Sequence, residues 1–154
     1  MAITRFVPSH KGGRRRVGIV LSRYSPAIGE ALLASALRAL AEAGVPDDAI
    51  TIATVPGALE TPLALQRMAQ SGDYDALIAL GAVIRGETYH FEIVANQSAA
   101  GVAAVALDFG IPVGNGILTC DSDAQAEARM DAKGHEAAQA ALELANLLDA
   151  IDDH

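Results

Sequence analysis

The sequence predicts an α/β protein whose four-stranded parallel sheet is covered by helices on both faces. Four short apolar runs alternate along the 154 residues with segments whose apolar residues recur at helical spacing. Each run is almost continuously apolar, as expected for a strand that is buried on both faces of a parallel sheet. Alternating strands and helices are joined by right-handed crossovers, which make neighbouring strands parallel.

The expected strands are residues 17–21, 50–55, 76–80 and 113–118. They are rich in valine, isoleucine, leucine and alanine, and the fourth directly follows Pro112. The whole chain has the same bias, with few aromatic residues and no tryptophan. Such a composition suits a buried sheet under alanine-rich helices.

Helices are expected between the strands. The first, residues 26–43, ends at Gly44, a residue type that commonly ends helices. The second, residues 62–69, starts with a proline, whose missing N–H is not needed in a first helical turn. The third, residues 91–109, is followed by Gly110.

The last helical stretch, residues 122–148, is expected to divide near Lys133 and Gly134. The tail from residue 149 to 154 is polar, and we expect it to fray. The apolar stripes that define the first, third and last helices are Ile28, Leu32, Leu33, Ala36, Leu37 and Leu40; Val94, Ser98, Val102, Val105 and Phe109; and Ala137, Ala141, Leu144 and Leu148.

Composition limits the class of protein. Apolar residues make up 51% of the chain and charged residues 19%, which fits one globular domain. We expect a flexible basic N-terminal arm at residues 1–15 and a single domain at residues 16–150. The formal net charge of −8 repels phosphate backbones and anionic lipids, which argues against nucleic acid and membranes as partners.

The basic cluster of Lys11, Arg14, Arg15 and Arg16 has two interpretations. The favoured one is a solvated arm before the first strand. The other is a secretory signal, which needs about 7–15 apolar residues after the charges. The apolar run 17–21 is too short for this, and no run approaches the roughly 18 residues of a membrane span.

A single cysteine, Cys120, agrees with a reducing compartment, and we expect a cytoplasmic protein. Cys120 follows an apolar run, which favours a small buried hydrophobic side chain. The alternative, a catalytic thiol, would need a histidine partner, and the sequence offers no specific pairing.

Ligands of open parallel sheets bind beyond the carboxyl ends of the strands. The segments that follow the four expected strands are residues 22–25, 55–60, 81–90 and 119–121. All of them are rich in glycine, polar or aromatic residues. The sequence therefore predicts a polar pocket with an aromatic wall at this edge.

The third of these segments carries the most specific chemistry. Gly86, Glu87 and Thr88 precede a helix, whose N-terminal N–H groups and dipole suit a phosphate. His90 follows directly, and a histidine beside an anion site is suited to proton transfer near neutral pH. In the alternative interpretation Thr88 only caps the helix and His90 is a surface residue.

Other polar residues at these strand ends also have two interpretations. Glu60 could accept hydrogen bonds from sugar hydroxyls, or it could simply favour the first turn of a helix. Tyr24 could stack on a planar heterocycle, or it could be a partly buried tyrosine at the rim. Arg129 and Lys133, taken alone, are solvated helix charges.

Taken together, these segments resemble the lumazine synthase family. The similarity extends from about Arg16 to Leu148, and its most specific part is the Val-Ile-Arg-Gly-x-Thr-x-His block, preceded by Pro-Gly-Ala-x-Glu. The matching blocks are 55–60, 81–91 and 112–119, followed by Arg129 and by Lys133 with Gly134. The resemblance implies a flavodoxin-like three-layer α/β/α sandwich.

The resemblance also implies a reaction. The family condenses 5-amino-6-ribitylamino-uracil with 3,4-dihydroxy-2-butanone 4-phosphate to form 6,7-dimethyl-8-ribityllumazine, the penultimate step of riboflavin biosynthesis. Every step is amine–carbonyl chemistry with proton transfer, so the resemblance implies neither a cofactor nor a metal. It further implies self-assembly into a homopentamer or a higher assembly, with riboflavin synthase as a candidate partner.

Each matching residue inherits an implied role. His90 matches a proton shuttle, and Arg129 matches an arginine that binds phosphate across a subunit interface. The other implied substrate contacts are Tyr24, which stacks on the pyrimidine; Ser25, at a position that is often Asn; Ala58, Leu59 and Glu60, at the pyrimidine and the ribityl hydroxyls; Ala82, Val83 and Ile84, along the pyrimidine edge; Gly86, Glu87 and Thr88, at the phosphate; Asn115, from the neighbouring subunit; and Lys133, near the site.

The chain departs from the family pattern at two places. Asn115 stands where the family often has Phe, which removes an aromatic wall. The segment 130–132 between Arg129 and Lys133 is shorter than is usual, and this linker region influences whether pentamers build larger shells.

Three rival functions remain at the level of sequence. A non-catalytic carrier or scaffold that binds flavin or lumazine would fit the change at Asn115, but Glu60, His90 and Arg129 argue against it. A related riboflavin synthase would not need the phosphate-side residues. A flavodoxin-like regulator would need an acidic pocket after the first strand, where this chain has Ser-Arg-Tyr at 22–24.

Overall fold

Parallel pairing of four strands forms the centre of the computed structural model, which describes residues 2–154. The strand order is β2-β1-β3-β4, and every neighbouring pair is parallel. The elements are β1 (Val17–Ser22), α1 (Pro26–Glu42), β2 (Ile50–Val55), α2 (Thr61–Ser71), β3 (Ala76–Ile84), α3 (His90–Phe109), β4 (Val113–Cys120) and α4 (Asp123–Asp152), with short 3-10 turns at Asp47–Ala49 and Ala58–Glu60.

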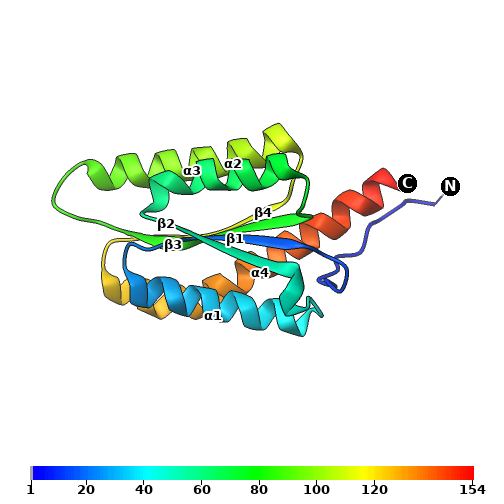
Figure 1. The fold of residues 1–154 in the computed structure, drawn as a ribbon, viewed down its shortest axis with the longest axis horizontal. Coiled ribbons are helices and arrows are strands. Elements are labelled where there is room, and N and C mark those ends of the chain that lie inside the picture. Colours follow the sequence, from blue (N-terminus) through cyan, green and yellow to red (C-terminus); the bar gives the residue numbers. More distant parts are fainter. Residues whose placement is uncertain (1) are drawn as a thin grey trace.

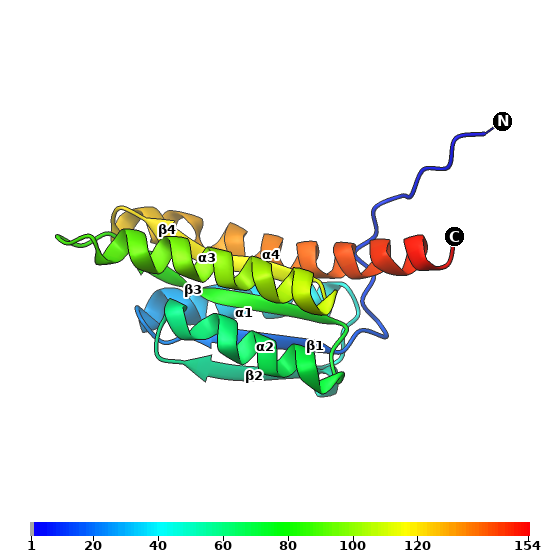
Figure 2. The same ribbon diagram turned by 90° about the horizontal axis from the view of Figure 1, so that it is seen from above.

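Helices cover both faces of the sheet. Helices α1 and α4 lie on one face, and α2 and α3 lie on the other (Figures 1 and 2). Each face has its own apolar core, one around Ile19, Leu32 and Ile78, the other around Val20 and Leu77. This is the flavodoxin-like three-layer sandwich that the sequence predicts. No helix within residues 2–154 combines the length and the apolar character that a membrane span requires.

Burial distinguishes the central strands from the edge strands. All residues of β1 are buried, as are all but the last of β3. In β2, by contrast, only Val55 is buried, and Ile52 is 43% exposed. The prediction that every apolar run is covered on both faces is therefore wrong for β2, because the covering helices pack mainly over the other three strands; β4, the other edge strand, keeps Ile117, Leu118 and Cys120 buried against them.

Three strands extend further than the sequence predicts, β1 to Ser22, β3 to Ile84 and β4 to Cys120. Strand β3 continues to Ile84 because Leu77–Ile84 pairs residue by residue with Val113–Cys120. The residues from Gly81 to Ile84, which were expected after the strand, therefore belong to it. The loop that follows β3 begins at Arg85.

Helix α4 is continuous from Asp123 to Asp152, so the predicted division near Lys133 and Gly134 is wrong. Gly134 is a site of close helix crossing. A Cβ atom there would overlap the carbonyl oxygen of Leu32 in α1 and would lie 2.9 Å from the Cβ of Ser35. Glycine is thus present because the two helices approach each other closely, and the helix does not end at it.

The end of α4 also differs from the prediction. Ala137 and Ala141 are buried as expected, but Leu144 is 38% exposed and Leu148 is only half-buried. The remaining buried positions on this part of the helix are Ala138, Leu142 and Ala145. The tail does not fray at residue 149, because the helix continues to Asp152.

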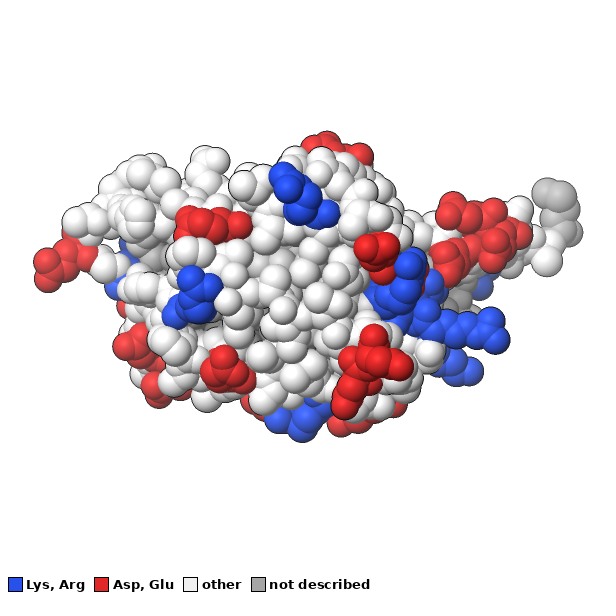
Figure 3. Space-filling view, viewed as in Figure 1, with Lys and Arg blue, Asp and Glu red and all other residues white. Residues whose placement is uncertain are grey.

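The N-terminal arm contacts the last turns of α4. The side-chain amide of Asn146 donates to the carbonyls of Ser9 and Lys11, at 2.8 and 2.9 Å, and its oxygen accepts from Arg15. Arg15 also pairs with Asp149 at 2.7 Å. Figure 3 shows Lys and Arg side chains beside acidic ones at the end of the molecule where both termini lie.

The close crossing at Gly134 predicts the sign of one substitution. Alanine is favoured over glycine in a helix by about 1 kcal/mol, whereas overfilling a packed contact costs about 1–3 kcal/mol. Because the overlapping atom is a backbone oxygen, the steric cost should dominate. We expect Gly134→Ala to lower the free energy of unfolding in urea by about 1 kcal/mol or more at equal chain concentration.

The control is Ala140→Gly, at an exposed position of the same helix. This variant measures only the helix preference of alanine over glycine, and it should lower the free energy of unfolding by about 1 kcal/mol. A Gly134→Ala variant that is more stable than the parent protein would show that α1 and α4 do not need this close contact.

Candidate active site

A pocket of about 320 Å³ lies at the carboxyl edge of the sheet. It is bounded by the ends of β1, β2 and β3 and by the start of α3. The residues that line it are Tyr24, Pro56, Gly57, Ala58, Leu59, Glu60, Ala82, Val83, Ile84, Gly86, Thr88, His90, Phe91 and Val94. Ten of the residues singled out in the sequence therefore share one cavity.

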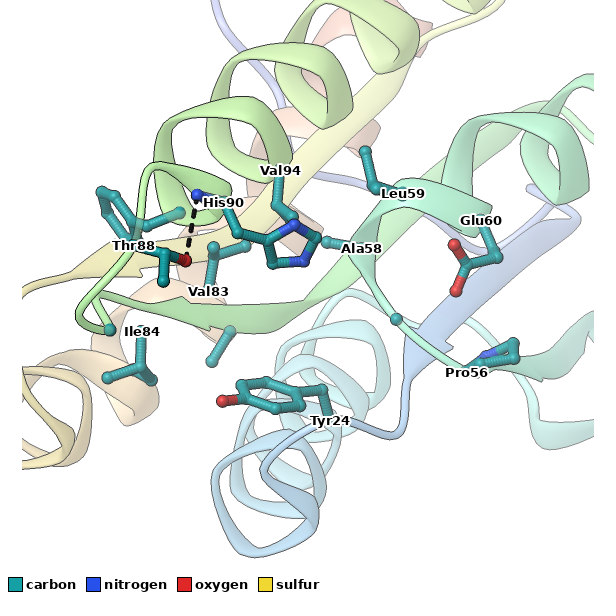
Figure 4. Close-up of a pocket in the computed structure, with 14 residues that line it drawn as sticks. Tyr24, Pro56, Ala58, Leu59, Glu60, Val83, Ile84, Thr88, His90 and Val94 are labelled. Carbon is teal, nitrogen blue, oxygen red and sulfur yellow. Dashed lines mark hydrogen bonds between the residues drawn. The ribbon is translucent and has the colours of Figure 1, made fainter.

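The walls of this pocket come from different parts of the chain. Tyr24 follows β1, and Glu60 ends the 3-10 turn after β2. Val83 and Ile84 are the last residues of β3. Figure 4 shows the rings of Tyr24, from the loop before α1, and His90, from the start of α3, approaching the same space, with the end of β3 beside them.

The pocket combines apolar walls with exposed polar side chains. Tyr24 is 57% exposed, and Glu60 and His90 are also exposed, so these three groups remain accessible to a ligand. Ala58, Ala82 and Val83 are buried and give the pocket an apolar floor. An aromatic face, a carboxylate and an imidazole around such a floor suit a planar heterocycle that carries hydroxyl groups.

The loop before α3 leaves backbone donors available. Residues 85–90 are all exposed, and the first helical residue is His90. The N-cap position is Tyr89, which makes no side-chain capping bond, and His90 N–H donates to Thr88 Oγ1 over 3.4 Å. Thr88 is thus only a weak acceptor one residue before the cap, and the helix start can still receive an anion.

Arg85 ties this loop to two other elements. Its Nη1 donates to Glu92 Oε1 in the first turn of α3 at 2.6 Å, and its Nε donates to Asp121 Oδ1 after β4 at 2.7 Å. The guanidinium carbon also lies 4.4 Å from the centre of the Phe91 ring. The acceptors Asp121 and Glu92 raise the pKa of Arg85, and the hydrogen bond from Arg85 lowers the pKa of Glu92.

Two of the predicted contacts lie near the pocket but do not line it. Glu87 is exposed in the loop and is absent from the pocket wall. Ser25 is the N-cap of α1, and its backbone has a left-handed conformation with φ of 56° and ψ of 66°. This conformation turns the chain sharply from Tyr24 into α1.

The basic residues of the predicted site lie elsewhere in the chain. Arg129 and Lys133 line a second cleft of about 510 Å³, between β4 and α4. They are four residues apart on one continuous helix, so they share a face. The side chain of Arg129 donates to the Gln125 carbonyl at 2.9 Å. A single chain therefore does not bring Arg129 into the pocket of His90.

Asn115 lines neither cavity. It is exposed on the edge strand β4, where its Oδ1 accepts from Ile117 N–H at 3.0 Å. Cys120 also lines the second cleft but is buried, 6% exposed, which fits a small hydrophobic side chain. Within residues 2–154, no three histidine, cysteine or acidic side chains come together as they would to hold a metal ion.

Four residues of the pocket are absent from the sites that we predicted. Pro56 and Gly57 form the turn before Ala58, inside a block that the sequence already singled out. Phe91 and Val94 are the other two. Val94 could have been found, because it lies one helical turn after His90 and must share its face.

This geometry defines a class: a flavodoxin-like α/β protein with a pocket whose lining suits a planar heterocycle, beside a helix start that can receive an anion. The family model described as 6,7-dimethyl-8-ribityllumazine synthase matches residues 14–149. The chain belongs to this family.

Curated relatives cover almost the whole chain. A protein of Azoarcus sp. (strain BH72) is 56% identical over 146 residues, which cover 95% of this chain and 94% of the relative. One from Ralstonia nicotianae is 54% identical over 153 residues, covering 97% and 93%, and one from Paraburkholderia phymatum is 51% identical over 152 residues, covering 99% and 88%. All three carry the name 6,7-dimethyl-8-ribityllumazine synthase.

The left-handed backbone at Ser25 leads to a prediction. Non-glycine residues in this region cost about 1–2 kcal/mol, most of all when they are β-branched, whereas Gly and Asn tolerate it. We expect Ser25→Val to lower the free energy of unfolding by about 1–2 kcal/mol, and Ser25→Gly and Ser25→Asn to retain it. Chemical denaturation of the three variants checks this. Equal stability of the valine and asparagine variants would contradict it.

Proposed function

We propose that the protein condenses 5-amino-6-ribitylamino-uracil with 3,4-dihydroxy-2-butanone 4-phosphate. The products are 6,7-dimethyl-8-ribityllumazine, phosphate and two molecules of water. The observation that carries this proposal is the common pocket of Tyr24, Glu60 and His90 at the carboxyl edge, in a chain that matches the family over residues 14–149.

The pocket suits the pyrimidine substrate. The exposed face of Tyr24 can stack on the heterocycle, and the end of β3 can contact the ring edge through its backbone groups. Glu60, on the side of the pocket away from Ile84 and Thr88 (Figure 4), can accept hydrogen bonds from ribityl hydroxyls. In this arrangement we expect the ring amine to lie near His90, which lines the same pocket.

The chemistry then needs only positioning and proton transfer. The 5-amino group attacks the ketone, and loss of water leaves an imine. A proton is removed from the carbon chain as the phosphate leaves, and the ribityl-bearing nitrogen closes the second ring with loss of the second water. His90, an exposed imidazole at the first residue of α3, is placed to move these protons.

The phosphate side needs two chains. The exposed N–H groups of the 86–88 loop and the start of α3 offer one half of a phosphate site. Arg129 and Lys133 lie in a separate cleft of the same chain, so they can complete the site only for a neighbour. We therefore propose a homopentamer or a higher assembly, in which each chain gives its pocket to one site and Arg129 to the next.

The alternative is a carrier or scaffold that binds flavin or lumazine without turnover. The loss of an aromatic residue at Asn115 suggests this alternative, but the Asn115 side chain lines neither cavity of the single chain. No observation favours it over catalysis.

Two further proposals concern the setting of the reaction. The lone, buried Cys120 agrees with a reducing compartment, and we place the protein in the cytoplasm. Riboflavin synthase, which consumes the lumazine product, is a candidate partner of the assembly.

Catalysis should depend on both halves of the site. Purified protein mixed with both substrates should form lumazine, which is followed by absorbance. We expect His90→Ala to lower kcat about 10²- to 10⁴-fold, because the proton shuttle is lost. Arg129→Ala should mainly raise the KM for the sugar phosphate, because one cation at the phosphate is lost. Pyrimidine binding without product in the parent protein would favour the carrier.

Mixing the two variants tests whether the site is shared between chains. At a sugar phosphate concentration well below the raised KM of Arg129→Ala, both His90→Ala and Arg129→Ala should be nearly inactive alone. After co-expression in equal amounts, a shared site is intact when its two chains supply complementary halves, which random assembly makes about one site in four. We expect about a quarter of the parent activity in the mixture. Activity no higher than the mean of the two variants would mean that each chain carries a complete site.

A further inference from the structure

Arg85 lies outside the pocket wall and yet connects three elements of the site. It is the first residue after β3, and its backbone N–H donates to the Cys120 carbonyl at 2.9 Å, which extends the pairing of β3 with β4 by one step. Its side chain then reaches Glu92 on one side and Asp121 on the other. The loop 86–89 therefore leaves the sheet from a residue whose backbone and side chain are both held by hydrogen bonds.

The geometry suits a clamp better than a ligand contact. A guanidinium is rigid and planar, and it can bind two carboxylates at once while it stacks on an aromatic ring. Arg85 does all three, with Glu92, Asp121 and the Phe91 ring. Two carboxylates against one guanidinium leave a net negative charge, which does not favour recruitment of a phosphate by Arg85.

The two partners of Arg85 lie at the starts of the two helices that carry the proposed catalytic groups, Glu92 in the first turn of α3 and Asp121 one residue before the N-cap of α4. Glu92 lies in the first turn of α3, two residues after His90. Asp121 N–H donates to the side chain of Gln125 at 2.7 Å, and the Gln125 carbonyl accepts from Arg129. One side chain thus fixes the start of α3 relative to the corner from which α4 and Arg129 follow.

We propose that Arg85 is a positioning residue, whose guanidinium holds the first turn of α3, and with it His90, in register with the β4–α4 corner. This inference rests on the proposed function only for its kinetic consequence. The expected effect of these contacts on the order of α3 does not depend on the substrate.

The overall stability should change little when the clamp is broken. Arg85 and both carboxylates are accessible to solvent, and exposed ion pairs contribute little to folding. A displacement of His90 by a fraction of an ångström is costly for catalysis, however, because proton transfer needs a narrow geometry. Loss of the contacts of Arg85 with Glu92 and Asp121 should therefore lower kcat and the local order of α3, and it should leave the free energy of unfolding nearly unchanged.

The first experiment compares Arg85→Gln, Arg85→Lys and Asp121→Asn with the parent protein. The control is Arg16→Gln, which breaks an exposed pair of the same kind, Arg16 with Asp75 at 3.2 Å, at the opposite end of the sheet. For Arg85→Gln and Asp121→Asn we expect kcat to fall about ten- to hundredfold while the KM of the pyrimidine stays within about twofold. Arg85→Lys should recover only part of kcat, because an ammonium cannot bridge both carboxylates.

The variant Asp121→Asn distinguishes a positioning role of Arg85 from direct binding of the phosphate by Arg85. If Arg85 held the phosphate itself, freeing it from Asp121 would leave kcat unchanged, and Arg85→Gln would raise the KM of the sugar phosphate instead. That pattern would overturn the proposal. If both residues act through one contact, the double variant Arg85→Gln/Asp121→Asn should be no slower than Arg85→Gln alone.

A second readout does not depend on activity. Hydrogen–deuterium exchange of the hydrogen-bonded amides in residues 92–96 should be about threefold faster or more in Arg85→Gln and Asp121→Asn, and unchanged in Arg16→Gln. Should the parent protein make no lumazine, the proposed function fails while this measurement still decides on the clamp. Unchanged exchange at the start of α3 together with unchanged kcat would overturn the clamp in an active enzyme.

Discussion

Parallel pairing of β3 with β1 on one side and β4 on the other is the constraint on which the rest of the molecule depends. Because the strands run in the same direction, every loop that carries a candidate functional residue leaves from the same edge of the sheet. Strands β1 and β3 are buried on both faces, so this edge is held by the best-packed part of the chain. The pocket can therefore present exposed side chains such as Tyr24, Glu60 and His90 while the positions of its walls remain fixed.

The extent to which the sequence predicted this arrangement varied with the kind of signal. The continuous apolarity of 17–21 and 76–80 located the two central strands because both faces of those strands are covered. The same signal overstated the burial of β2, since an apolar run does not distinguish an edge from a centre. The end of β3 was placed four residues too early, because Gly81 resembles a loop residue and its pairing with β4 is a property of the sheet.

The residues of the candidate site also differ in how well the sequence predicts their positions. The residues that line the pocket come from the segments after β1 and β2 and from the end of β3 through the start of α3, and the topology brings these segments together without further information. Arg129 and Lys133 could not be placed in this way, since they lie within α4 and line a cleft beyond β4. Arg85 was not singled out because its partners, Glu92 and Asp121, are 7 and 36 residues away in the chain.

Both termini lie together at one end of the molecule, and the pocket loops lie at the other end (Figure 1). The contacts of Asn146 and Arg15 hold residues 9–15 of the arm against the last turns of α4. Fusion partners attached at either terminus would project away from the pocket. The protein could therefore display a peptide or a second domain at each chain end and leave the proposed site open to small molecules.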